Sequence, residues 1–412
     1  MIRKAMLLLL CLCALISCAS AEDELLIIHA TDMHFLSPQL TDYGEAFMEI
    51  VRAADGKVTH YTPELMQAFV SDMLTLKPDA VILSGDLTLN GAEESHRELA
   101  EILLPLKQAG IAVLVLPGNH DTGTDAYRFG VDGAEVIAGT EDERFDDLYA
   151  GFGYDEAISR DSASMSYLAG ISENVWCLLI DVNANGTYGT VQKDTLAWAE
   201  EQLIRAGEEN KTVIAVTHQS LLQHSRLFSF GYMINNSTSL LDLFETYQVR
   251  LNLSGHLHMQ HIAHSGSVTE IAGSSLAVSP NQYGVIRMEG SRLLDYSTQP
   301  VDVAAWAKEN GQTNPDLLQF ASYSAAFFDQ TSLGQPEEML VALGIDEAEI
   351  EQMTELAVRL NREYFAGARK ASEADQAIEL WHKHLPDQFL TRYLQSILDE
   401  PAALMNQFVF GQ

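Results

Sequence analysis

Aspartate, asparagine and histidine side chains recur in five short motifs along the chain. In order, the motifs are Asp32-Met33-His34, Gly85-Asp86, Gly118-Asn119-His120-Asp121, Thr217-His218 and Gly255-His256-Leu257-His258. Oxygen and imidazole ligands without a thiolate are typical of sites for Mn²⁺, iron or Zn²⁺. The carboxylate of Asp86 offers two oxygens, which is enough to bridge two cations. The motifs therefore predict a site for two divalent metal ions.

Two such cations would suit chemistry at phosphorus. Metals about 3.5–4 Å apart can share one hydroxide, polarise a phosphoryl oxygen and support an in-line displacement. The carboxylates of Asp32 and Asp86, with a bridging hydroxide, would neutralise three of the four positive charges. The remaining charge suits the single negative charge of a phosphodiester, and it leaves the dianion of a phosphomonoester open.

Each motif follows an apolar run that is typical of a buried strand. The runs are residues 25–28, 80–83, 113–116, 212–216 and 249–253. Short apolar runs that end near Gly or Pro indicate core strands rather than helices. Helical patterns alternate with strands over residues 24–300, so we expect a layered α/β domain built from two strand-rich halves. Loops after the strands would bring the motifs to one edge of the sheets.

Two segments fall outside this alternation. Residues 122–165 form a long insertion with turn signals, which we interpret either as a lid or as decoration packed on the rim. From residue 301 onward the sequence has only helical periodicity, which predicts a small C-terminal all-helical domain over residues 301–412. Its histidines, His382 and His384, follow no strand, so we expect them at solvated helix positions.

The charge of the chain limits its partners. The formal net charge is −34, from 58 acidic and 24 basic residues. A surface of this sign repels polyanions, so we do not expect long nucleic acid as a substrate. Small phosphate esters remain compatible, because bound cations reverse the sign locally.

The N-terminus has the features of an export signal. Arg3 and Lys4 precede an apolar run, residues 5–16, that is too short to span a bilayer. Residues 15–18 match a bacterial lipobox, so we expect a signal peptide and short tether over residues 1–21, with lipid on Cys18. This would anchor the protein to the outer face of a bacterial cell membrane. Cleavage after Ala21 would instead give a freely secreted protein. Cys177 would then have no partner, and we expect no disulfide.

Over about residues 24–290, the chain resembles the calcineurin-like metallophosphoesterase superfamily, and the five motifs carry the resemblance. It implies a four-layer α/β/β/α sandwich over the catalytic domain, residues 22–300. It also implies that one metal is held by Asp32, His34, Asp86 and His258, and the other by Asp86, Asn119, His218 and His256. His120 would lie beside the phosphate and protonate the leaving oxygen or stabilise the transition state. Asp121 would hold the loop or orient His120.

More narrowly, the chain is similar to a group of bacterial lipoproteins described as 3′,5′-cyclic-nucleotide phosphodiesterases. Residues 85–91, 151–154 and 301–412 match that group, as does the lipobox. The phosphoprotein phosphatases of the superfamily carry an Asp-Arg pair where this chain has Leu89 and Asn90. Without that arginine there is no bidentate clamp for a phosphate dianion at this place, although Arg128 or Arg226 can substitute for it.

These observations favour a phosphodiesterase that acts on cyclic nucleotides or another small phosphodiester, through attack by a metal-bridging hydroxide. A phosphomonoesterase or nucleotidase with the same metals is the alternative. A third hypothesis is a metal-dependent binding lipoprotein whose helical domain docks a protein partner.

Overall fold

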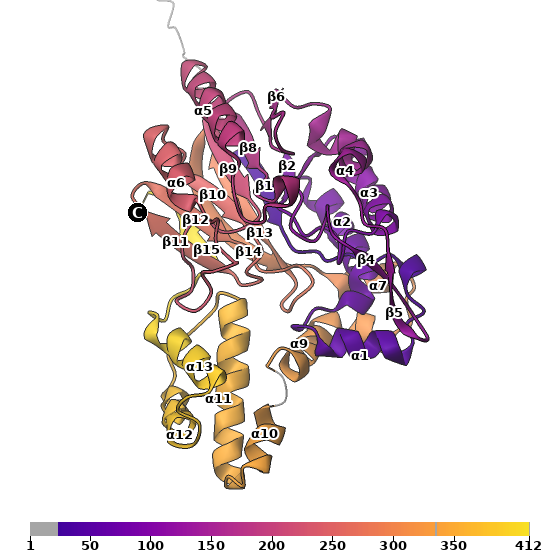
Figure 1. The fold of residues 1–412 in the computed structure, drawn as a ribbon, viewed down its shortest axis with the longest axis vertical. Helices are drawn as coiled ribbons and strands as arrows, with labels where there is room; N and C mark the ends of the chain where they lie inside the picture. The colour runs from indigo at the N-terminus through magenta and orange to yellow at the C-terminus, as the bar shows by residue number, and fades with distance from the viewer. Residues whose placement is uncertain (1–23, 334–335, 412) are drawn as a thin grey trace, which may run out of the picture.

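Two β-sheets form the body of the molecule. The computed structural model describes residues 24–333 and 336–411 (Figure 1). The first sheet has the order β15-β14-β13-β1-β2-β3 and the second has the order β11-β12-β10-β9-β8-β7-β6. The strands of the first sheet are β1 (Glu24–Ala30), β2 (Ala80–Leu83), β3 (Ala112–Val115), β13 (Gln282–Glu289), β14 (Arg292–Pro300) and β15 (Gln407–Val409). Those of the second are β6 (Ser159–Arg160), β7 (Tyr167–Gly170), β8 (Val175–Ile180), β9 (Thr212–Thr217), β10 (Leu251–Ser254), β11 (His261–Ser265) and β12 (Val268–Ala272).

The strands that lead to the five motifs lie parallel to one another within each sheet. In the first sheet, β1 pairs with β2 and β2 with β3. In the second, β9 lies between β8 and β10. Parallel strands deliver their carboxyl ends to the same edge of a sheet, which is where α/β folds place their binding sites. The predicted strands are thus found, and each ends beside its motif.

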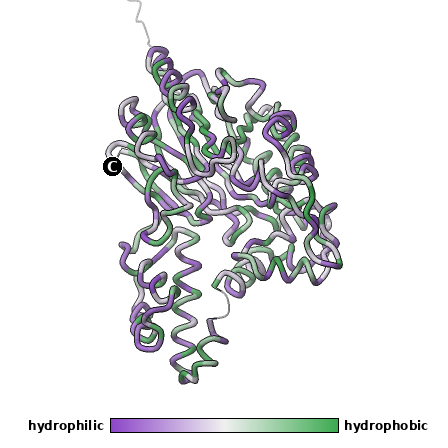
Figure 2. The backbone as a smooth tube through the Cα atoms, viewed as in Figure 1, coloured by the Kyte–Doolittle hydropathy of each residue, from purple (hydrophilic) through white to green (hydrophobic). Residues whose placement is uncertain are grey.

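Strand β9 shows how the layers are formed. Ile214 and Val216 point into the core that the two sheets share. Val213 and Ala215 point the other way, into a core with the helices that cover the second sheet. This alternation is the period of two expected of a strand that is buried on both faces. Figure 2 shows hydrophobic stretches both in the centre of the body and along the helices, where they alternate with hydrophilic ones.

Helices cover both sheets, which confirms the predicted α/β/β/α arrangement. Helices α2 (Thr62–Leu76) and α3 (Glu93–Gln108) pack on the side of the first sheet, and α5 (Lys193–Glu208) and α6 (Ser237–Thr246) on the second (Figure 1). Helix α1 (Glu45–Ala53) and helix α6 were not predicted from the sequence.

The insertion at residues 122–165 is packed rather than open. It forms the hairpin of β4 (Ala126–Gly130) and β5 (Gly133–Ile137), followed by α4 (Asp142–Tyr149). Phe145 and Tyr149 of α4 are fully buried. This favours decoration over a lid, because burying these rings ties the segment to the core.

The C-terminal region is helical, as predicted, except for its last strand. It contains α7 (Val303–Glu309), α8 (Pro315–Leu318), α9 (Phe320–Thr331), α10 (Pro336–Ala342), α11 (Glu347–Phe365), α12 (Ile378–His384) and α13 (Phe389–Asp399). Helix α7 packs on α2 of the sandwich. Helices α10 to α13, here called the helical lobe, have a hydrophobic core of their own. Strand β15, which was not predicted, returns to pair with β14.

No helix of the described residues combines the length and apolar character needed to cross a membrane. The predicted signal peptide and Cys18 lie outside the described residues. Cys177 is buried in β8.

Candidate metal centre

The structure brings the predicted ligands together in two groups that share Asp86. Within each group, one ligand atom from every member lies within 4.8 Å of those of the others. The first group is Asp32, His34, Asp86 and His258, and the second contains Asp86, His218 and His256. Asn119 adjoins the second group, because its side-chain oxygen lies 3.1 Å from Nε2 of His218. All seven predicted ligands are therefore gathered at one edge of the sandwich.

The backbone is strained at these residues. Asp32, His34, Asp86, His256 and His258 have φ angles between 44° and 64°. They are five of the ten non-glycine residues with positive φ in the described chain. Such conformations cost of order 1–3 kcal/mol each and persist where the surrounding structure enforces them, most often at functional sites. The strained backbone indicates that the fold places these side chains at the cost of an unfavourable backbone conformation.

Two glycines of the motifs allow the loops to approach one another. A Cβ atom on Gly118 would lie 2.2 Å from the backbone nitrogen of Asp86. A Cβ atom on Gly255 would lie 1.9 Å from Oγ1 of Thr31. Any larger residue would push the loops apart, so these glycines are required for the ligands to converge.

The first group is arranged as cation ligands are. Nε2 of His34 and Nε2 of His258 lie 3.0 Å apart, and the latter lies 3.4 Å from Oδ1 of Asp32. That carboxylate oxygen is buried and has no hydrogen-bond partner. The other oxygen of Asp32 accepts from Oγ1 of Thr31 at 2.8 Å and from the backbone of His256 at 2.9 Å. A buried carboxylate oxygen without a donor is costly, and a bound cation would satisfy it. The residues thus fit a divalent metal.

Asp55 and Lys57 support this first group, and sequence reasoning missed both. Nδ1 of His258 donates to the carboxylate of Asp55 at 3.1 Å, and Lys57 pairs with the same carboxylate at 2.6 Å. A carboxylate on the far nitrogen of a ligating histidine fixes the ring and its tautomer. No local signal marks the two residues, since they follow a helix rather than a strand.

In the second group, each histidine has one nitrogen occupied by a backbone carbonyl. Nδ1 of His218 donates to the carbonyl of Ser84 at 2.9 Å. This leaves Nε2 to face Oδ1 of Asp86 at 3.3 Å. Nε2 of His256 donates to the carbonyl of Gly231 at 2.9 Å, which leaves its Nδ1 as the free nitrogen. These bonds determine which lone pair each ring can offer to a metal.

Buried carboxylates raise the pKa values of two histidines of the cluster. Burial alone would lower the pKa of His218, but the carboxylate of Asp86 outweighs it and raises that pKa to about 9. Burial would also lower the pKa of His258, but the carboxylate of Asp32 outweighs burial and raises that pKa to about 9. Burial lowers the pKa of His256 to about 4. The carboxylates thus favour positive charge within both groups, as they would for bound cations.

His120 lies beside both groups without belonging to either. Its Nδ1 donates to the carbonyl of Leu89 at 2.9 Å, and its Nε2 lies 3.9 Å from Oδ2 of Asp86. Its side chain is 46% exposed, unlike the buried ligands. Nε2 is therefore free to exchange a proton with a bound molecule, as the predicted role requires.

Asp121 joins the loops that follow β2 and β3. Its carboxylate accepts from the backbone of Leu87 at 3.0 Å, of Thr88 at 2.9 Å and of Gly118 at 2.8 Å. Burial, and to a lesser extent the negative charge of Asp86, raises the pKa of Asp121 to about 6. These contacts correspond to the loop-holding alternative of the prediction rather than to an orienting bond with His120.

No arginine clamp is found among the residues considered from the sequence. Asn90 is buried and donates to the carbonyl of Tyr127 at 3.2 Å. Arg226 lies 3.6 Å from the carboxylate of Asp399 on α13, and Arg128 is exposed on β4. The positive charge of Lys57 contributes instead to lowering the pKa of His34, after burial as the larger cause. Lys57 is thus the nearby cation that acts on His34, although it is itself paired with Asp55.

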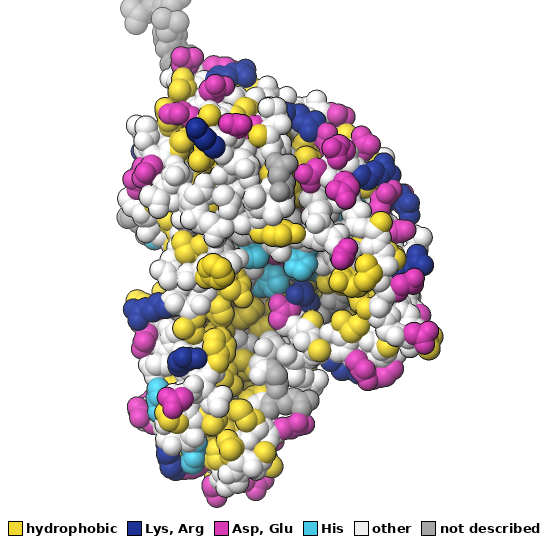
Figure 3. Space-filling view, in the orientation of Figure 1, with side chains coloured by type: hydrophobic (Ala, Val, Ile, Leu, Met, Phe, Trp, Pro, Cys, Tyr) yellow, Lys and Arg dark blue, Asp and Glu magenta, His cyan; other side chains and the backbone are white. Residues whose placement is uncertain are grey.

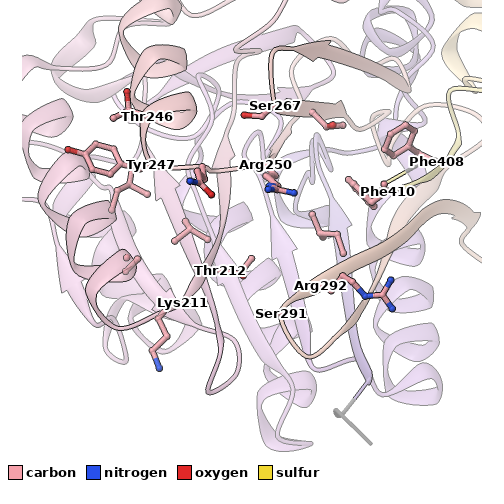
Figure 4. Close-up of a pocket in the computed structure, with 18 residues that line it drawn as sticks. Lys211, Thr212, Thr246, Tyr247, Arg250, Ser267, Ser291, Arg292, Phe408 and Phe410 are labelled. Carbon is pink, nitrogen blue, oxygen red and sulfur yellow. The ribbon is translucent and has the colours of Figure 1, made fainter.

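The histidines line a hollow between the sandwich and the helical lobe, with hydrophobic side chains on its walls (Figure 3). A separate groove of about 980 Å³ lies away from the ligand edge. Lys211, Arg250 and Arg292 are among its lining residues, together with Phe408 and Phe410 (Figure 4). It contains none of the motif residues, so the chemistry predicted from the motifs belongs to the hollow.

Comparison with known proteins agrees with this geometry. A model of the calcineurin-like phosphoesterase family matches residues 25–260, and a model of the C-terminal domain of cyclic nucleotide phosphodiesterase matches residues 302–403. A "Probable cyclic nucleotide phosphodiesterase" of Ruthia magnifica is 31% identical over 86 residues, which cover 21% of this chain and 34% of that protein. The cAMP/cGMP dual specificity phosphodiesterase of Mycobacterium tuberculosis is 21% identical over 239 residues, covering 58% and 63% of the two chains. The matched part is thus less than two thirds of either relative.

A third relative and one solved structure are similar over larger shares of their length. A "Probable glycerophosphodiester phosphodiesterase" of Arcobacter nitrofigilis is 22% identical over 269 residues, covering 63% of this chain and 86% of that protein. A dimetal phosphatase from Danio rerio aligns with a TM-score of 0.45 and 12% identity, over 67% of this chain and 95% of that one. The phosphoesterase model spans more than half of the chain and contains all five motifs. The chain therefore belongs to the calcineurin-like phosphoesterase family.

Proposed function

We propose that this protein is a two-metal phosphodiesterase that hydrolyses cyclic nucleotides or another small phosphodiester. The observation that carries the proposal is the pair of ligand groups that share Asp86, with Nε2 of His120 beside them. The activities named for the Mycobacterium tuberculosis and Arcobacter nitrofigilis relatives support a diester rather than a monoester.

The side chains have distinct roles in this proposal. Asp32, His34, Asp86 and His258 hold one metal, and Asp86, Asn119, His218 and His256 hold the other. Oxygen and imidazole donors without thiolate suit Mn²⁺, iron or Zn²⁺. When bound, the two cations supply a nucleophilic hydroxide and the positive charge that stabilises the phosphoryl oxygens.

His120 acts on the proton of the reaction. Its Nδ1–H is held by the carbonyl of Leu89, so Nε2 faces the site. When the ring also carries a proton on Nε2, that proton can pass to the leaving oxygen or form a hydrogen bond to the phosphoryl group in the transition state. Lys57 adds a positive charge at this edge, but as a single ammonium it does not reproduce the two-pronged clamp of an arginine. This arrangement favours a substrate with one negative charge.

We further propose that the protein is exported and carries lipid on Cys18, which would anchor it to the outer face of a bacterial cell membrane. The support is the basic, apolar and lipobox order of the first 18 residues. Radiolabelled palmitate incorporation that is lost in Cys18→Ala would support this, and unchanged incorporation would contradict it.

The enzymatic proposal is tested with a chain that begins at residue 19, stripped of metal and refilled with Mn²⁺. Hydrolysis of 3′,5′-cyclic AMP and of AMP is followed in one assay. We expect cyclic AMP to be converted to AMP without release of phosphate. Phosphate release from AMP with cyclic AMP untouched would overturn the proposal in favour of a nucleotidase. Two bound metals without hydrolysis of any phosphate ester would instead favour a binding protein.

A further inference from the structure

The loop that carries the last two predicted ligands has two faces. His256 and His258 face the metal centre, and the residues that alternate with them, Leu257 and Met259, are 6% and 2% exposed. Both apolar side chains belong to the hydrophobic core of the helical lobe, together with Trp381 of α12 and Leu394 of α13. The core of the lobe is therefore built directly on the back of a metal-ligand loop.

A second segment links the lobe to the same ligand. Residues 226–232, here called the strap, begin where Arg226 lies 3.6 Å from the carboxylate of Asp399 on α13. The ring of Phe228 packs against the lobe core, with its centre 6.0 Å from that of Tyr393. The strap thus starts as part of the surface of the lobe.

The strap ends on His256. The carbonyl of Gly231 accepts from Nε2 of His256 at 2.9 Å, and the ring of Tyr232 lies 5.6 Å from the imidazole. The rings of Phe228 and Tyr232 also contact each other at 5.3 Å. A continuous chain of contacts therefore runs from α13 to the nitrogen that selects the tautomer of His256.

Two of the other ligand histidines are held from the sandwich or its loops. His218 is held by the carbonyl of Ser84 at the end of β2, and His258 by the carboxylate of Asp55 after α1. The ring of His256 lies 5.1 Å from that of His218, but its hydrogen bond goes to the carbonyl of Gly231 in the strap. A ligand whose orienting partner is lost typically costs 10–100-fold in metal affinity.

We propose that the helical lobe is a positioning element of the metal centre, and that through the strap it holds His256 in place for the second metal. This inference rests on the ligand assignment of the proposed function, but not on hydrolysis. Its test measures metal binding without a substrate, so it can fail or succeed independently of the reaction.

The test compares two phenylalanines of the strap in the full chain. Phe228→Ala removes the ring that packs on the lobe, whereas Phe230→Ala removes a ring that is 93% exposed two residues away. Mn²⁺ binding to the metal-free proteins is measured by titration calorimetry. We expect Phe228→Ala to weaken the second equivalent of Mn²⁺ by about 10–100-fold and to leave the first unchanged. Phe230→Ala is expected to bind both equivalents as the parent does.

Melting of the metal-free proteins and a milder variant separate this role from general destabilisation. Phe228→Leu keeps an apolar contact with the lobe and is expected to recover most of the affinity for the second metal. Arg226→Ala weakens the link at an exposed position and should shift the second equivalent in the same direction, by less. Unchanged binding of both metals to Phe228→Ala would overturn the proposal. Equal weakening of both, together with a lower melting temperature without metal, would overturn it as well.

Discussion

The two ligand groups share Asp86 and each contains two histidines, yet different parts of the molecule support them. In the first group, Asp32 is held by its neighbour Thr31, and His258 by Asp55, which follows α1. In the second group, His256 is held by a carbonyl of the strap, which is packed on the helical lobe. The first metal position is thus supported by the carboxylate of Asp55. The second is supported by the strap and, through it, by the helical lobe, which follows the sandwich in sequence.

This difference indicates that residues outside the family fold and its ligand motifs also help to hold the ligands in place. The lobe offers no predicted ligand: His384 pairs with Glu349 at 2.7 Å, and His382 contacts Gln395 at 2.8 Å. Its proposed contribution is to hold the strap and the loop that carries His256 and His258. Variants that act on both metals, on neither, or on one of them can therefore separate the two kinds of support.

Asp86→Asn should have the largest effect, because both groups use this carboxylate. The substitution removes the charge that pairs with His218 and leaves one oxygen fewer for cations. We expect loss of both Mn²⁺ equivalents in calorimetry and no measurable phosphodiesterase activity. Retention of two metals by this variant would show that Asp86 is not the shared ligand.

His120→Ala should affect neither metal and still lower turnover strongly. Removal of a general acid typically costs roughly 10²–10⁴-fold in rate. The metal content, measured by inductively coupled plasma mass spectrometry, should stay at two per chain, because the ring of His120 is exposed beside the ligand groups. A parallel loss of metal and activity would make His120 a ligand or a folding residue instead.

Asp55→Ala should act on the first position alone. The variant frees Nδ1 of His258, which now donates to the carboxylate of Asp55. We expect one Mn²⁺ equivalent to weaken by roughly 10–100-fold, as for other partners of ligating histidines. Asp132→Ala, on the exposed hairpin of β4 and β5, is the matched control. If Asp55→Ala instead weakened the equivalent that Phe228→Ala affects, the distinction between the two supports would be wrong.

A pH dependence that both positions share is the least specific prediction, because it does not distinguish the two supports. Without metal, the pKa values of His218 and His258 are raised to about 9, so both rings are protonated at neutral pH and must lose a proton to bind a cation. Apparent affinity should rise by about tenfold per pH unit for each position up to about pH 9. The raised pKa values stabilise the metal-free fold fully below about pH 6.5, and that contribution is lost as the pH rises through 9.

Thermal melts with and without Mn²⁺, recorded under nitrogen at pH 6 and pH 8.5, measure this effect. The increase in melting temperature on adding metal should be larger at pH 8.5. An increase that is the same at both pH values would mean that these histidines do not lose protons to the metal.

The sequence predicted the strands and the convergence of the motifs because both follow from local patterns. Apolar runs such as residues 80–83 become strands of the expected bounds, and their parallel pairing sends the following side chains to one edge. Strand β15 was missed because three residues carry too little pattern, and its pairing with β14 depends on the folded sandwich. Within the helical periodicity predicted from residue 301 onward, the chain is divided at Gln319 into α8 and α9.

Supporting residues could not be found in this way. Gln219 and Thr31 adjoin motif residues and contact Asn119 and Asp32, so proximity in sequence was a usable signal for them. Asp55 and the carbonyl of Gly231 had none, since they reach the centre only through tertiary packing. A backbone carbonyl is present in every residue, so no residue type in the sequence marks the one that holds His256.

The central claim is that these side chains bind two metal ions around a shared aspartate. Anomalous X-ray diffraction from crystals loaded with Mn²⁺ tests it most directly. The account predicts two peaks, one bounded by Asp32, His34 and His258 and one by Asn119, His218 and His256, with the carboxylate of Asp86 between them. A single peak, or peaks that Asp86 does not touch, would contradict it.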